Sequence, residues 1–328
     1  MQRGVGIISF LCGVLIVSAV FAYTDARASA GTAAAAVPSP AAPVVLLSQP
    51  ADTPAPEPTP AATPIPLATP TPTPAVHPAW TPLAASIQAL VDAAGAQAGV
   101  ELIELGGKVP ATFADNPSMT FGAASDYKLV ALMAEAQGIA AGSIDPRGLV
   151  CYEDSDYEDG WFNDYGPGAC FTRNELAARA GLYSDNTAGH MLVRDLGGSD
   201  ALNAFARKYG ATGSDLFDTN TTTAHDLAVL LAAESAGQLG GPAAQAWLYP
   251  VLTNSRYEAG IPAGLQKGQK AIHKTGELDL EVNDAALVTG GANGAYVLVV
   301  LTDSAGGDAG WTLIAQISAA VAKYEAAR

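Results

Sequence analysis

The sequence predicts an α+β fold, in which a five-stranded antiparallel sheet is flanked by terminal helices and accompanied by an all-helical lobe. After residue 79, apolar residues recur at helical spacing near the start and the end of the chain and throughout a long central block. Strand-like runs occur before and after that block, so the last three strands can join the first two in one sheet. We expect a sheet lobe over 80–124 and 265–328, a helical lobe over 125–264, and a site in the cleft between them.

The expected elements follow in order along the chain. The first helix places Leu83, Ile87, Leu90 and Val91 at helical spacing. A hairpin follows, with strands over 100–105 and 108–113 around a glycine turn. The helices of the central block are expected over 125–138, 173–180, 184–196, 200–209 and 223–236. The last elements are three strands over 271–278, 283–289 and 295–302, and a helix over 310–325.

Composition and charge restrict the class of protein. The 328 residues are 49% hydrophobic and 15% charged, which is enough apolar material for a packed domain and excludes a wholly disordered chain. The 16 lysines and arginines stand against 32 aspartates and glutamates, so the net charge is −16. Because this charge repels phosphate backbones, we expect no nucleic-acid partner.

The first 30 residues have the pattern of a secretory signal peptide. Arg3 precedes an uncharged apolar run over 4–22, and Ala28-Ser29-Ala30 has the form of a cleavage site. This pattern predicts export to a secreted, periplasmic or cell-surface location. The alternative is an uncleaved membrane anchor, because the run is about as long as a bilayer span. We expect no other membrane attachment.

Residues 31–79 are predicted to form a disordered linker before the folded domain over 80–328. Fifteen of the 22 prolines lie between Pro38 and Pro82, where they alternate with threonine and alanine. Such a stretch favours extended polyproline geometry and cannot bury a core. We interpret it as a spacer without a specific partner.

Cysteines and metal ligands are few. Removal of the signal peptide leaves Cys151 and Cys170, which we expect to form a disulfide in an exported protein, with two free thiols as the alternative. The four histidines have no second ligand at zinc spacing, which disfavours zinc chemistry. The chemistry predicted below requires no metal or organic cofactor. The acidic stretch over 153–160 lacks a glycine at the sixth place from Asp154, which favours a solvated loop at the cleft edge over a calcium site.

Three short motifs contain residues suited to acyl transfer. Ser125 and Lys128 lie three residues apart, which on a helix puts both on one face, where a neutral lysine can activate the serine. The alternative is a plain helix start with Ser125 as the N-cap. The S-D-N triplet at 184–186 offers either a second hydroxyl for proton relay or an N-cap. The K-T-G triplet at 274–276 lies on a predicted strand and offers groups that bind a carboxylate.

In the order S-x-x-K, S-D-N and K-T-G, these motifs are typical of class A β-lactamases and penicillin-binding proteins. The sequence resembles the class A β-lactamase and penicillin-recognising serine hydrolase family over about residues 83–328. The wider match covers residues 124–125, 183–188, 196–198, 221–223 and 273–276. The resemblance implies a β-lactamase/transpeptidase-like fold and acyl-enzyme chemistry on a small-molecule β-lactam or a peptidoglycan-like acyl substrate.

The resemblance also implies a role for each motif residue. The implied catalytic residues are the nucleophile Ser125, its proton acceptor Lys128, and Ser184 as the relay to the leaving nitrogen. The implied substrate-binding residues are Asn186, Lys274, Thr275 and Gly276. Backbone N–H groups of Ser125 and Glu277 are implied as the oxyanion hole, which stabilises the charge that develops in the transition state.

Two features depart from the family pattern. Residues 210–221 contain no glutamate, whereas class A β-lactamases carry one there that positions the deacylating water. Asp215 and Asp218 are the only carboxylates in that segment, and we interpret them as turn or cap residues. Glu277 puts an anionic side chain where the family has a small residue, which disfavours substrates that carry a carboxylate.

We therefore predict an exported serine hydrolase of the β-lactamase type that deacylates slowly. One alternative is a penicillin-binding acylase that acts on D-alanyl peptides, and another is a non-catalytic cell-surface binding module of the same fold. The lifetime of the acyl-enzyme separates the first two, because acylation needs the three motifs whereas fast deacylation needs a positioned water.

Overall fold

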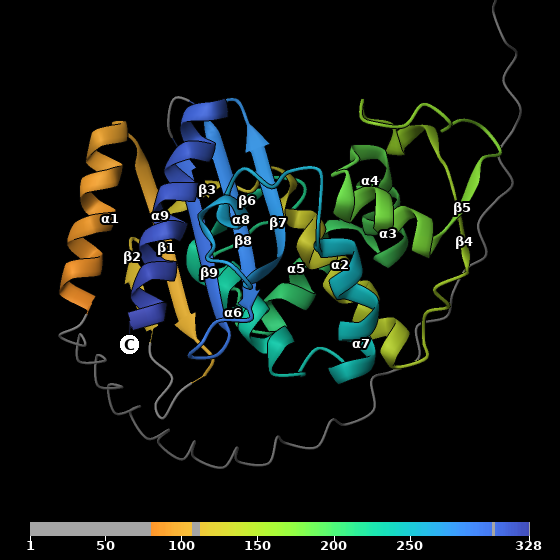
Figure 1. Ribbon diagram of the computed structural model, residues 1–328. Helices are drawn as coiled ribbons and strands as arrows, with labels where there is room; N and C mark the ends of the chain where they lie inside the picture. Colours follow the sequence, from red (N-terminus) through yellow and green to blue (C-terminus); the bar gives the residue numbers. More distant parts are fainter. Residues whose placement is uncertain (1–79, 107–111, 304–305, 328) are drawn as a thin grey trace, which may run out of the picture. The chain divides into compact units, whose positions relative to one another are not determined.

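The sheet at the centre of the fold has the strand order β2-β1-β9-β8-β7 and is antiparallel throughout (Figure 1). The structure is a computed structural model that describes residues 80–106, 112–303 and 306–327. The strands are β1 (Gln97–Glu104), β2 (Thr112–Asp115), β7 (Lys270–Leu278), β8 (Glu281–Thr289) and β9 (Tyr296–Asp303). Because β1 pairs with β9 over its whole length, the prediction that the last three strands join the first two is confirmed.

The central strands are buried on both faces because both faces are covered. Residues 296–302 of β9 and 282–288 of β8 are buried without interruption. Strands of this kind lack the alternation of apolar and polar residues that marks a half-exposed strand. They separate two hydrophobic cores, one on each side of the sheet.

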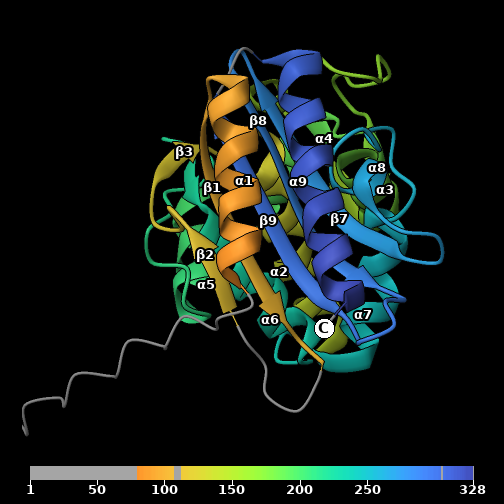
Figure 2. The same ribbon diagram turned by 60° about the vertical axis from the view of Figure 1, so that its left-hand side comes forward.

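The terminal helices α1 (Trp80–Ala94) and α9 (Gly307–Ala327) lie side by side on one face of the sheet (Figure 2). The predicted helical spacing of Leu83, Ile87 and Val91 forms the buried face of α1. Trp80 Nε1 donates a hydrogen bond to Tyr324 Oη at 2.6 Å, which joins the start of α1 to the end of α9. The short helix α8 (Ile261–Gly264) also packs on α9.

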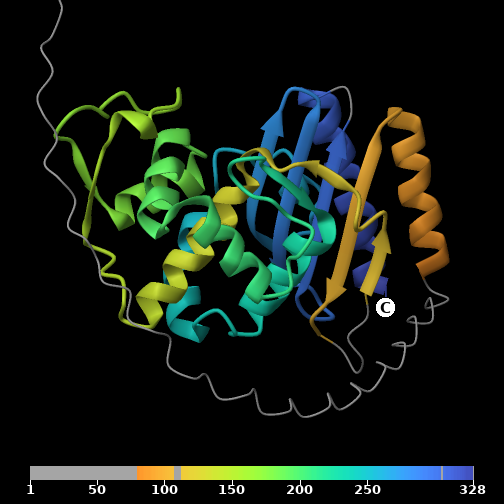
Figure 3. The same cartoon turned by 180° about the vertical axis from the view of Figure 1, so that it is seen from behind.

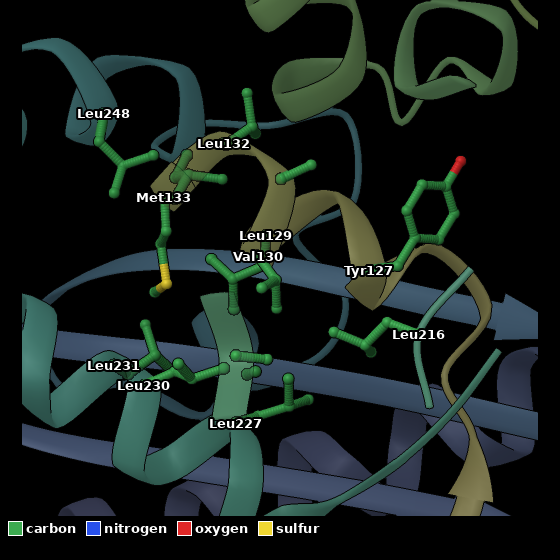
Figure 4. Packing of buried hydrophobic residues seen from close by; sticks show 14 of the residues in the cluster. Tyr127, Leu129, Val130, Leu132, Met133, Leu216, Leu227, Leu230, Leu231 and Leu248 are labelled. Carbon is green, nitrogen blue, oxygen red and sulfur yellow. The ribbon is translucent and has the colours of Figure 1, made fainter. Parts of the chain in front are cut away.

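The opposite face of the sheet carries α6 (Ala224–Ser235), and the other helices of the central block lie beside it (Figure 3). They are α2 (Tyr127–Ala140), α3 (Arg173–Leu182), α4 (Asn186–Leu196), α5 (Gly198–Lys208) and α7 (Gly241–Leu248). Helix α2 contacts the other four, so it is apolar nearly all round. Figure 4 shows Met133 of α2 between Leu248 of α7 and Leu231 of α6.

Several short elements were not predicted from periodicity. They are the two-stranded sheets β3 (Thr120–Gly122) with β6 (Thr221–Thr223) and β4 (Leu149–Cys151) with β5 (Cys170–Thr172), and the helices α7 and α8. A three-residue strand has no periodicity of its own, so tertiary pairing determines it. The helix expected over 125–138 begins as a 3₁₀ turn, η1 (Ala124–Asp126), and continues as α2. Strand β2 runs to Asp115, beyond its predicted end at residue 113.

The predicted disulfide between Cys151 and Cys170 is present. The two cysteines face each other in the β4–β5 ladder, and they close residues 152–169, here called the acidic loop, at its base. Over the part of the chain that the structure describes, no helix combines the length and apolar content needed to cross a membrane. The signal peptide or anchor expected over 1–30 and the linker expected over 31–79 lie outside the described residues.

Candidate active site

The three motifs meet at a cleft of about 530 Å³ where β7 approaches η1 and the start of α4. The predicted site residues that line it are Ser125, Ser184, Asn186, Thr275 and Glu277. The other lining residues are Gly160, Trp161, Tyr257 and Trp311. Lys128 and Lys274 are buried behind the lining. The structure thus brings together residues that lie up to about half the chain apart in sequence.

Ser125 lies in η1, directly after a residue with left-handed main-chain geometry. Ala124 has φ of +46°, a conformation that residues with a side chain rarely adopt. Its carbonyl oxygen accepts a hydrogen bond from Asn220 Nδ2 at 2.9 Å, and the Ala123 N–H donates to the Asn220 carbonyl at 2.7 Å. The segment before β6 therefore holds the turn that presents Ser125 to the cleft, as is common for strained residues at active sites.

The amine of Lys128 links the motifs. Its Nζ is 2.8 Å from Ser125 Oγ, 2.8 Å from the Ser184 carbonyl oxygen and 2.7 Å from Asn186 Oδ1. Burial, together with the charge of Lys274, lowers the pKa of Lys128 well below its usual value. A neutral amine donates its two N–H groups to the two carbonyl-type oxygens, which leaves its lone pair for the hydroxyl proton of Ser125. This arrangement can deprotonate Ser125 as its oxygen attacks an acyl carbon.

Ser184 connects the two buried lysines. Its carbonyl oxygen accepts a hydrogen bond from Lys128, and its Oγ accepts one from Lys274 Nζ at 2.8 Å. Burial lowers the pKa of Lys274 to about 8, although the charges of Asp126 and Asp284 raise it. Ser184 thus contacts Lys128 through its carbonyl and Lys274 through its hydroxyl, and a hydroxyl beside a lysine that carries charge near neutral pH can relay a proton.

Asn186 is the first residue of α4, behind the N-cap Asp185, whose carboxylate accepts a hydrogen bond from the Ala188 N–H at 2.9 Å. The N-cap interpretation of the S-D-N triplet is thus correct for Asp185. Both N–H groups of the Asn186 amide already have acceptors, Glu158 Oε1 at 2.8 Å and the Asp159 carbonyl oxygen at 3.0 Å. Both donors of the Asn186 side chain are therefore occupied in this structure.

Gly276 allows β7 to approach η1 closely. A Cβ atom at this position would lie 2.7 Å from the Ala123 carbonyl oxygen, so a larger residue would displace the strand from the nucleophile. Glu277 follows it as an exposed residue of the cleft lining, beside Thr275. The negative charge expected at the cleft from the sequence is therefore present.

The segment 210–221 does not bring a carboxylate to the cleft lining. The Asp215 carboxylate accepts a hydrogen bond from Thr219 Oγ1 at 2.7 Å, so its turn interpretation is confirmed, and Asp218 is exposed. Phe217 of this segment instead packs edge-to-face against the rings of Tyr127 and His190. An aromatic ring thus occupies the space beside α2 and α4.

The acidic loop reaches the cleft, as its sequence indicated, but its aromatic contribution was missed. Trp161 Nε1 donates a hydrogen bond to Tyr257 Oη at 3.0 Å, and the Arg256 guanidinium lies 4.8 Å from the Trp161 ring. These contacts join the acidic loop to the segment before α8. A single tryptophan or tyrosine has no spacing that a motif could show, so no sequence signal pointed to this wall.

Carboxylates of the acidic loop bind an arginine of α4. Asp156 accepts hydrogen bonds from Arg194 Nε at 2.8 Å and Nη2 at 3.0 Å, and Glu153 accepts one from Arg194 Nη1 at 2.9 Å. Among the residues that the structure describes, no group of three or more histidine, cysteine or acidic side chains is arranged to hold a metal ion. The acidic stretch thus contributes ion pairs to the fold.

A serine within hydrogen-bond reach of a buried lysine, with a second hydroxyl and a second lysine on an α+β scaffold, is typical of the serine hydrolase class. Comparison with known families agrees with this class. The model of the family described as "Beta-lactamase enzyme family" matches residues 82–324, and the chain belongs to that family.

Solved structures and curated relatives show the same likeness. PBP-A is 26% identical with a TM-score of 0.70, over 74% of this chain and 95% of that one. The beta-lactamase from Sphaerobacter thermophilus is 25% identical with a TM-score of 0.68, over 76% of this chain and 98% of that one. A beta-lactamase of Mycobacterium tuberculosis is 32% identical over 155 residues, which cover 42% of this chain. The chain spans about half the length of the curated relatives it matches.

Proposed function

We propose that the protein is an exported hydrolase in which Ser125 forms an acyl-enzyme with a β-lactam or a related amide. The observation that carries this proposal is the 2.8 Å contact between Lys128 Nζ and Ser125 Oγ, with the other two contacts of the amine directed to oxygen acceptors. In acylation, Ser125 Oγ bonds to the acyl carbon and its proton passes to Lys128. The C–N bond then breaks as Ser184 gives its proton to the nitrogen and regains one through Lys128.

Substrate binding follows the lining of the cleft. Lys274 and Thr275 bind the substrate carboxylate, Asn186 binds its amide side chain, and the backbone N–H groups of Ser125 and Glu277 form the oxyanion hole. Support for a β-lactam comes from a mutant of PBP-A, solved as an acyl-enzyme complex with penicillin G and 26% identical to this chain.

Slow deacylation is part of the proposal, because residues 210–221 contain no glutamate and place Phe217 beside α2. The second candidate is an acylase of the penicillin-binding type with a long-lived adduct on D-alanyl peptides. The similarity to PBP-A favours it.

The test is intact-mass spectrometry of the full chain mixed with a penicillin and a cephalosporin, with adduct and free drug followed over time. We expect one covalent adduct that decays slowly while drug is consumed. The adduct should be absent in Ser125→Ala and unchanged in Ser86→Ala, a serine exposed on α1. A persistent adduct without drug consumption would favour the second candidate, and no adduct on folded protein would leave a binding module.

A further inference from the structure

The acidic loop brings a carboxylate to the motif residues from an unexpected direction. We propose that Glu158 is the catalytic residue that activates water for hydrolysis of the acyl-enzyme, in place of the glutamate missing from 210–221. This inference rests on the proposed function, since it concerns the second half of the same reaction. It assigns to the acidic loop the task that another loop performs in class A β-lactamases.

The first support is a short chain of hydrogen bonds. Glu158 Oε1 accepts from Asn186 Nδ2 at 2.8 Å, and Asn186 Oδ1 accepts from Lys128 Nζ at 2.7 Å. Lys128 Nζ lies 2.8 Å from Ser125 Oγ. The carboxylate is thus connected to the nucleophile through one amide and one amine. The Glu158 side chain is 52% exposed, so water has access to it.

The second support is the way the loop is fixed at Glu158. Thr187 Oγ1 accepts a hydrogen bond from the Glu158 N–H at 3.1 Å and donates one to the Glu158 carbonyl at 2.8 Å. Two residues further on, a Cβ at Gly160 would lie 2.7 Å from Asp185 Oδ2, so glycine permits the approach of the loop to α4. Groups that are held before the reaction need no ordering during it, which is what a water-positioning carboxylate requires.

The third support is a proton acceptor behind the carboxylate. His190 Nε2 lies 3.0 Å from Glu158 Oε2, and His190 Nδ1 lies 3.1 Å from the Asp156 carbonyl oxygen, which can only accept. The ring proton of a neutral His190 therefore belongs on Nδ1. Burial lowers the pKa of His190, which favours this neutral form. Its Nε2 can share the proton that arrives at Glu158.

The fourth support is a buried hydroxyl near the same group. The Tyr127 hydroxyl has no hydrogen-bond partner in the described part of the chain, and it points away from the aliphatic cluster (Figure 4). Burial and the charges of Glu158 and Asp185 raise its pKa, so it is a neutral O–H donor. The Tyr127 ring lies 6.4 Å from the His190 ring, and His190 contacts Glu158, so this donor can hold an ordered water on the same side of the acidic loop.

The step balances as follows. The water oxygen bonds to the acyl carbon as one of its O–H bonds breaks, and the proton goes to Glu158, where it is shared with His190. The proton held at Glu158 then passes through solvent to the neutral amine of Lys128, and Lys128 gives a proton to Ser125 Oγ as the C–Oγ bond breaks. The two parts of the water thus end on the product acid and on Ser125, and Lys128 is neutral again.

Glu158→Gln tests the proposal, because glutamine still accepts the hydrogen bond from Asn186 but cannot take a proton. Acylation and deacylation rates are measured separately on the full chain by stopped-flow with a chromogenic cephalosporin and by intact mass. We expect acylation within about threefold of wild type and deacylation slower by roughly 10²–10⁴-fold, the usual scale for loss of a general base. Asp154→Asn, on the exposed side of the same loop, should change neither rate.

The other outcomes distinguish this inference from the proposed function. Equal deacylation rates in wild type and Glu158→Gln would overturn the role of Glu158 and leave the proposed function standing. A wild-type adduct that never decays would have the same consequence. Parallel slowing of both rates shows that Glu158 only holds Asn186, which also overturns the role. If wild type forms no adduct, the proposed function fails with it. Should Glu158→Gln not fold, Glu158→Asp keeps the carboxylate and must retain part of the deacylation.

Discussion

The buried carboxyl group of Asp126, the residue that follows Ser125, interacts electrostatically with the buried amine of Lys274. Neither Asp126 oxygen has a hydrogen-bond partner among the described residues. Burial raises the pKa of Asp126 to about 8, whereas the charge of Lys274 lowers it. Burial likewise lowers the pKa of Lys274 to about 8, whereas Asp126 raises it more than any other group. The two residues therefore set each other's charge near neutral pH.

Asp126→Asn should weaken the binding of anionic substrates. Above pH 8 Asp126 is ionised, and without its charge the pKa of Lys274 falls further, so less of the lysine is charged there. We expect the second-order acylation rate for a penicillin to fall by about tenfold at pH 9, the effect of one pKa unit, and to recover as the pH is lowered. Rates from pH 5 to 9 check this, with Asp92→Asn on the exposed surface of α1 as the control. A pH-independent loss would contradict it.

Glu277→Gln should have the opposite effect on the same substrates. The exposed carboxylate lines the cleft and repels a substrate carboxylate. Repulsion between two fully hydrated charges about 4 Å apart is worth about 1 kcal/mol, so acylation by a penicillin should rise about fivefold at low ionic strength. The gain should shrink in high salt, because salt screens exposed charges. Asp279→Asn at the exposed end of the β7–β8 hairpin should leave the rate unchanged, and an equal gain there would show a general charge effect.

Stability should fall at alkaline pH because of His273. Burial lowers the pKa of its imidazole, but the carboxylates of Asp284 at 2.9 Å and Glu258 at 3.4 Å raise it to about 9 overall. A pKa raised by folding stabilises the protein fully below the unfolded value of about 6.5, and this contribution is lost as the pH rises through 9. Denaturant unfolding of wild type and His273→Asn at several pH values isolates it.

The difference in unfolding free energy between wild type and His273→Asn should decrease by on the order of 3 kcal/mol between pH 6 and pH 9.5. The lowered pKa of Lys274 makes the unfolding free energy rise with pH above pH 8, which is the opposite direction. This contribution is common to both proteins, so it cancels in the difference between them. A difference that stays constant over this range would show that His273 keeps the same charge in both states.

The main sheet and the three motifs could be predicted because their signals are local. The helical or strand periodicity of each element is visible in its own residues. Ser125 and Lys128 likewise lie about one helical turn apart, within a single segment. The order of the motifs then linked segments that are distant in sequence. The buried strands β8 and β9 were also found, since their apolar runs are bounded by glycine turns.

Glu158 could not be predicted, because its position depends on contacts outside its own segment. Residues 153–160 contain several carboxylates with no periodicity that selects one of them. Thr187, on α4, holds the Glu158 main chain against the start of that helix, whereas Arg194 pairs with Asp156. Helix α7 was missed for a related reason, since its alanine-rich sequence becomes a defined face only when packed on α2.

The hydrogen bond between Trp80 and Tyr324 determines where the described domain receives the preceding chain. Trp311, which lines the cleft, lies in the first turns of α9, whereas Tyr324 lies in its last turns. Trp311 and Tyr324 are 13 positions apart in this helix, about 20 Å along the axis. Residue 80, where the described domain begins, therefore lies beside the end of α9 that is remote from the cleft.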